Sequence, residues 1–131
     1  MPYLLDTNIL SDLMRHPGGR IADQIAQTEQ YVCTSIIVVA ELKYGIVKAG
    51  SRRLARQLAA ILGGIEVIPF ETPADVAYAE LRTQLERAGR PIGGNDLLIA
   101  AHALTLDMTL VTANEREFAR IPDLRIENWL D

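Results

Sequence analysis

The stretch that decides the fold is Tyr3-Leu4-Leu5-Asp6-Thr7-Asn8-Ile9-Leu10. Its apolar run stops at Asp6, and aspartate and asparagine favour turns and helix caps. The stretch therefore predicts a short buried strand that enters a helix, which ends near Pro17-Gly18-Gly19. A carboxylate at the end of such a strand lies where open α/β sheets bind their ligands.

The same alternation of strand and helix patterns continues along the chain. Further strands are predicted at residues 31–34, 65–70, 110–112 and 124–126. Further helices are predicted at residues 21–26, 36–47, 51–62, 73–88 and 95–106, with a short one ending at 118 and Thr72 as a cap. This order indicates an α/β fold, with a mainly parallel sheet of four to five short strands flanked by helices.

Length and composition limit the possible classes of protein. With 131 residues, 49% of them hydrophobic, the chain is expected to form one domain over residues 1–131. The net charge of -4 argues against a protein that holds nucleic acid by general positive charge. The chain has a single cysteine, Cys33, and does not begin with a leader-like segment, which predicts a cytoplasmic protein. It has no apolar run of about 20 residues, so we expect it not to enter membranes.

Two acidic residues lie on predicted helices, each on an apolar face. Glu41 shares its face with Ile37, Val38, Tyr44 and Gly45. Asp96 shares its face with Ile99, Ala100 and Ala103. Two further polar candidates follow predicted strands: Asp6 and Asn114. Unpaired buried carboxylates are costly, so such groups are protonated, paired with a cation or bound to a metal.

An all-oxygen set of ligands favours magnesium, with manganese as a possible substitute, and no Cys/His cluster has the spacing of a zinc site. Each residue alone has a structural alternative: Asp6 as a helix cap, Asp96 as a first-turn acid, and Glu41 in a buried salt bridge with arginine. Their occurrence together favours a metal site.

These residues stand in four segments that resemble the motifs of the PIN-domain family, specifically its VapC-like toxin branch. The segments are residues 3–10, residues 35–45 around Glu41, residues 90–103 around Asp96, and residues 110–118 followed by Ile121-Pro122 and Glu127-Asn128-Trp129. The resemblance spans nearly the whole chain. It implies that Asp6, Glu41 and Asp96 are metal ligands.

The resemblance also implies an activity and its partners. It implies a magnesium-dependent endoribonuclease that hydrolyses RNA with metal-activated water and leaves a 5′-phosphate and a 3′-hydroxyl. It further implies a homodimer and a VapB-like antitoxin whose tail reaches the acidic cleft, with promoter DNA bound only through the antitoxin.

One position departs from the family pattern, because Asn114 stands where many PIN nucleases have aspartate. An amide can ligate a metal through oxygen but brings no charge. Glu117, one helical turn further on, is the other candidate for the fourth site member, and Thr7, Asn8 and Thr112 are expected to support the ligands.

Two other functions remain open from the sequence. One is a PIN-like dimerisation or binding module without catalytic activity, which the asparagine at position 114 would favour because it replaces an acid. A phosphotransfer α/β domain is weaker, because Asn8 stands where one such family needs a second aspartate, and no lysine follows a late strand. His102 is expected to have a structural or dimer role, and the run Arg52, Arg53 and Arg56 to form a solvated helix face.

Overall fold

The computed structural model describes residues 2–131 and contains one five-stranded parallel sheet in the order β3-β2-β1-β4-β5. The strands are β1 (Tyr3–Leu5), β2 (Val32–Ser35), β3 (Glu66–Ile68), β4 (Thr109–Val111) and β5 (Ile126–Glu127). The first strand is central: Leu5 pairs with Thr34 on one side and with Val111 on the other. The predicted α/β class and parallel sheet are therefore confirmed.

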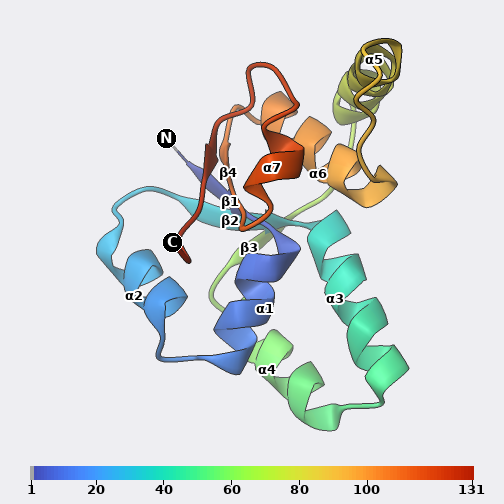
Figure 1. The fold of residues 1–131 in the computed structure, drawn as a ribbon. Helices are drawn as coiled ribbons and strands as arrows, with labels where there is room; N and C mark the ends of the chain where they lie inside the picture. The colour runs from blue at the N-terminus through green and yellow to red at the C-terminus, as the bar shows by residue number, and fades with distance from the viewer. Residues whose placement is uncertain (1) are drawn as a thin grey trace.

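Seven helices connect these strands in the described residues. They are α1 (Thr7–Arg15), α2 (Arg20–Gln27), α3 (Ile36–Ala49), α4 (Arg52–Leu62), α5 (Ala74–Arg87), α6 (Gly94–Thr105) and α7 (Glu115–Phe118). Figure 1 shows α1 to α4 below the strands and α5 to α7 above them, so both sides of the sheet are covered.

The core lies where the sheet meets these helices. Leu4, Leu5 and Leu110 on the central strands are fully buried, as are Ile9 of α1 and Ile99 of α6. Burial of a large aliphatic side chain contributes roughly 1.5–3 kcal/mol, so these apolar strands hold the sheet between its helices.

The N-terminal cap of α5 is the point at which the prediction was wrong. The capping position is occupied by Pro73 rather than Thr72, and no side chain caps the helix there. By contrast, the Ser35 and Ser51 hydroxyls accept from backbone N–H groups at the starts of α3 and α4. Within residues 2–131, none of the helices is long and apolar enough to span a bilayer.

Candidate active site

The central feature of the site is Asp6, which follows β1 and caps α1. Its side chain is 2% exposed and accepts hydrogen bonds from the Thr7 amide (2.7 Å), Thr112 Oγ1 (2.8 Å) and Asn8 Nδ2 (3.3 Å). Thr112 comes directly after β4, so parallel pairing of β1 with β4 places both residues at the carboxyl edge of the sheet. All three donors are neutral, so the hydrogen bonds hold the carboxylate without cancelling its charge.

Glu41 joins Asp6 through Thr7. The Thr7 hydroxyl donates to Glu41 Oε1 at 2.7 Å, and Asn95 Nδ2 donates to Glu41 Oε2 at 3.2 Å. Thr7 begins α1 and Asn95 lies in the first turn of α6. The half-buried glutamate of α3 is thus fixed between the starts of two other helices.

Asn114 connects the remaining two acids. Its Nδ2 lies 3.4 Å from Asp96 Oδ2 and 3.1 Å from Glu117 Oε2, and its backbone N–H donates to Thr112. Ionised carboxylates only accept hydrogen bonds, so the amide nitrogen, not the amide oxygen, faces both acids. The other oxygen of Glu117 accepts from the Gly93 N–H at 3.1 Å. The structure therefore gathers all five predicted site residues in one hydrogen-bonded region.

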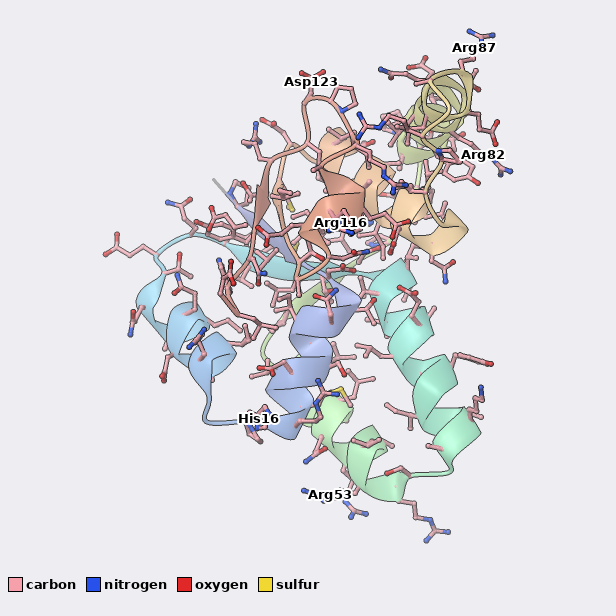
Figure 2. The ribbon with its side chains drawn as sticks, viewed as in Figure 1. His16, Arg53, Arg82, Arg87, Arg116 and Asp123 are labelled. Carbon is pink, nitrogen blue, oxygen red and sulfur yellow. The ribbon has the colours of Figure 1, made fainter. Side chains whose placement is uncertain are left out.

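None of these four carboxylates forms an ion pair in the part of the chain that the structure describes, and Arg120 acts on Glu117 only through its charge. The ion pairs among residues 2–131 join His16 to Asp12, Arg82 to Glu86, and Arg125 to Asp107. Figure 2 shows Arg53 pointing outward from α4, and Arg82 and Arg87 pointing outward from α5. The expected alternative of a salt bridge between Glu41 and an arginine is therefore wrong.

Burial and mutual repulsion act on the two central aspartates. Burial raises the pKa of Asp6, and the charge of Glu41 raises it further against the three hydrogen bonds. Burial and the charges of Asp6, Glu117 and Glu41 raise the pKa of Asp96 to about 6, while the Asn114 hydrogen bond lowers it. Hydrogen bonds from Asn114 and Gly93 lower the pKa of Glu117, and the charge of Arg120 lowers it further. The site thus holds more negative charge than its own groups compensate.

The acids surround a shared region without closing on one point. Across residues 2–131, no three carboxylate, histidine or cysteine side chains converge closely enough to ligate one ion together. Magnesium is usually held by one or two carboxylates and keeps several waters, so its binding does not need three direct side-chain ligands. The oxygen-only donors, the 2% exposure of Asp6 and the lack of an ion pair to any of the four acids in the described residues fit a hydrated divalent ion.

Two contacts of the site were not predicted from the sequence. Asn95 orients Glu41, and the Gly93 amide orients Glu117. Both residues precede Asp96 at the start of α6, where polar groups and free amides are expected. The partners depend on how α6 packs against α3 and α7, which residue spacing along one helix does not specify.

The predicted apolar face around Glu41 is only partly buried. Val38 is buried, but Tyr44 is 67% exposed and Val47 is 79% exposed. In the second half of α3, Leu42 and Ile46 pack against the core and Tyr44 faces outward, so the prediction was wrong for Tyr44. The face around Asp96 agrees with expectation, because Ile99, Ala100 and Ala103 are fully buried.

The family model described as PIN domain matches residues 3–124 of the chain. The chain belongs to the PIN domain family. The matched region holds the first three motifs and residues 110–122 of the fourth, and the family membership replaces the phosphotransfer alternative.

Relatives that match over their whole length place this PIN domain in the VapC branch. The chain is 42% identical to Ribonuclease VapC2 of Rickettsia felis and 36% identical to the tRNA(fMet)-specific endonuclease VapC of Salmonella typhimurium, each over 98% of both chains. Among solved structures, VapBC2 from Rickettsia felis bound to a DNA fragment from their promoter matches with a TM-score of 0.91 and 40% identity, over 98% of this chain and 99% of that chain. VapBC-1 from nontypeable Haemophilus influenzae matches with a TM-score of 0.85 and 35% identity over both whole chains.

Proposed function

We propose that this protein is a magnesium-dependent endoribonuclease and the toxin of a VapBC-type pair. The observation that carries the proposal is the collection of Asp6, Glu41, Asp96 and Glu117 at the carboxyl edge of the sheet, none of them in an ion pair. The relatives named as VapC ribonucleases, similar over their full length, support the same activity.

Asp6, Asp96 and Glu41 would hold the ion, in part through its bound water molecules, and manganese would substitute for magnesium. When bound, the ion lowers the pKa of a water and stabilises charge on a phosphoryl oxygen. The chain's own contribution is to fix the acids: Thr112 orients Asp6 and Thr7 orients Glu41. Asn114 orients the carboxylates on α6 and α7. Water attacks the phosphodiester in this scheme, so the 2′-hydroxyl is not the nucleophile, and a 5′-phosphate and a 3′-hydroxyl result.

Asn114 does not make the site idle. Its amide leaves four carboxylates in place and donates to two of them, which supports catalysis over a binding module without activity. Glu117 is therefore the proposed fourth acid, and Asn114 the group that positions it beside Asp96.

The proposed partners follow from the VapBC structures and from the surface charge. A VapB-like antitoxin with a basic tail would enter the acidic region and compete with the metal, and promoter DNA would be bound through the antitoxin. The protein would form a homodimer in the cytoplasm. The net charge of -4 fits a basic inhibitor segment better than direct binding to DNA.

The activity is tested by incubating purified protein with RNA in magnesium, in manganese and in excess EDTA. Cleavage with either metal, its loss in EDTA, and 5′-phosphate ends on the products are expected. Cleavage that persists in excess EDTA would refute the metal dependence. Growth arrest on expression of the parent, absent for Asp6→Asn and relieved by the antitoxin, tests the toxin role.

A further inference from the structure

A hollow of about 500 Å³ opens beside the acidic site, between α3 and α6. The residues that line it are Thr7, Ile37, Ala40, Glu41, Tyr44, Asn95 and Leu98. Thr7 and Asn95 are the two residues whose side chains hydrogen-bond to Glu41. The hollow and the acidic site therefore share a wall, and a strand bound at the acids would pass its mouth.

The hollow combines apolar walls with one exposed aromatic ring. Ile37, Ala40 and Leu98 supply the apolar surface, and the Tyr44 side chain is 67% exposed. Lys48 Nζ lies 5.8 Å from the centre of the Tyr44 ring and interacts with one of its faces. An exposed aromatic ring next to a cation is the combination with which proteins bind unpaired bases and the phosphates that connect them.

The hollow is large enough to admit one nucleobase, and Thr7 and Asn95 supply polar groups in its wall. Sites for small ligands enclose roughly 300–1,000 Å³, and the hollow falls in that range. Tyr44 follows Glu41 by three residues, which places it on the same side of α3 about one turn away. Within the described residues nothing donates to the Asn95 amide oxygen, which leaves an acceptor for a base edge.

We propose that this hollow binds one unpaired nucleobase beside the scissile phosphate, stacked on Tyr44. The inference rests on the proposed ribonuclease function and adds a subsite to it. Stacking is available to every base, so the subsite selects an unpaired base more than a particular sequence. It explains how an acidic protein holds an anionic strand: the base contributes affinity next to carboxylates that repel the backbone.

The test couples a protein change to a substrate change. The probe is a 12-nucleotide single-stranded RNA that the parent cleaves at one bond, together with copies in which one nucleotide at a time is abasic. One abasic position should lower kcat/KM of the parent by about 5- to 150-fold, the range for loss of one stacked base. Tyr44→Ala should lower kcat/KM on the intact RNA to a similar extent. The kcat/KM of this variant should be the same for the intact RNA and for the RNA with that abasic position.

Matched variants separate stacking from other roles. Tyr44→Phe and Tyr44→Trp keep an aromatic face and should lose less activity than Tyr44→Ala. Val47→Ala, also on the exposed part of α3 and outside the hollow, should leave kcat/KM unchanged.

Two results would overturn the subsite while leaving the ribonuclease function intact. One is a parent that cleaves RNA and a Tyr44→Ala variant that cleaves it equally well. The other is an abasic position that lowers kcat/KM of the parent and of Tyr44→Ala by the same factor. This result overturns the subsite even if sedimentation shows that Tyr44→Ala changes the oligomeric state. A parent that cleaves no RNA would overturn both the function and the subsite.

Discussion

Replacing Asp96 by asparagine should stabilise the metal-free protein and at the same time abolish its activity. Asp96→Asn removes one negative charge from a group of four with little change in volume. The pKa of Asp96 is raised from 3.8 to about 6 by burial and by the charges of Asp6, Glu117 and Glu41. The folded state therefore favours the neutral form of this side chain, which asparagine imitates at every pH.

The size of the effect follows from that pKa. One pKa unit corresponds to about 1.36 kcal/mol, so the upper limit is about 3 kcal/mol of unfavourable free energy at neutral pH. Asp96 is only half-buried, and solvent screening reduces the expected gain to about 1–2 kcal/mol. Because the folded pKa is the higher one, the metal-free parent is most stable below about pH 4 with respect to this group. It loses that stability as pH rises through about 6, whereas the variant lacks this dependence.

Urea unfolding in EDTA and in magnesium, at pH 5 and pH 7.5, measures the stability of the metal-free protein and its gain from the metal, and RNA cleavage in magnesium measures the loss of activity. In EDTA at pH 7.5 the variant should be more stable than the parent. In magnesium the order should reverse, because the parent gains about 2.7 kcal/mol when free metal is about 100 times Kd, and the variant gains less. Asp123→Asn makes the same chemical change at an exposed, distant loop and should behave like the parent in both buffers. An Asp96→Asn protein that is less stable than the parent in EDTA, or that gains equally from magnesium, would refute the reasoning.

Three further changes test other parts of the structure. Asn114→Asp replaces a donor to two carboxylates by a further charge, so it should lower metal-free stability by roughly 1–3 kcal/mol and increase the gain from magnesium in the same unfolding assay. Glu117→Gln should reduce kcat by less than Asp96→Asn does, because its oxygen can still accept from Gly93; an equal or larger loss in single-turnover cleavage would make Glu117 a principal ligand. His102→Phe removes the 2.8 Å hydrogen bond between His102 Nδ1 and Ser35 Oγ, so unfolding should show a loss of about 1–3 kcal/mol, and unchanged stability would show that this buried contact contributes little.

The parts of the site that the sequence predicts are those set by local pattern. Asp6 and Asn114 were found because each follows a short apolar strand, and parallel pairing then brings both to one edge. Asp96 was found because its helical neighbours are apolar throughout. Each of these inferences needs only a few consecutive residues and a known period.

The parts that were missed depend on packing between distant elements. His102 was assigned a structural or dimer role, and its 1% exposure leaves the structural one: it bonds to Ser35 at the start of α3. Asn95, at the other end of α6, bonds to Glu41. These two contacts join the first half of α3 to the two ends of α6. Periodicity within either helix specifies neither this pairing nor the exposure of Tyr44.

The central place of the first strand has a consequence for the cell that makes this protein. A ribosome releases Asp6 and Glu41 early, but Thr112, which bonds to Asp6, is 106 residues further along the chain. Until β4 has emerged and paired with β1, the nascent chain lacks the hydrogen bond from Thr112 to Asp6 and the loop that carries Asn114 and Glu117. We therefore expect the site to be completed only when synthesis is almost finished, and chains that terminate before β4 to be inactive.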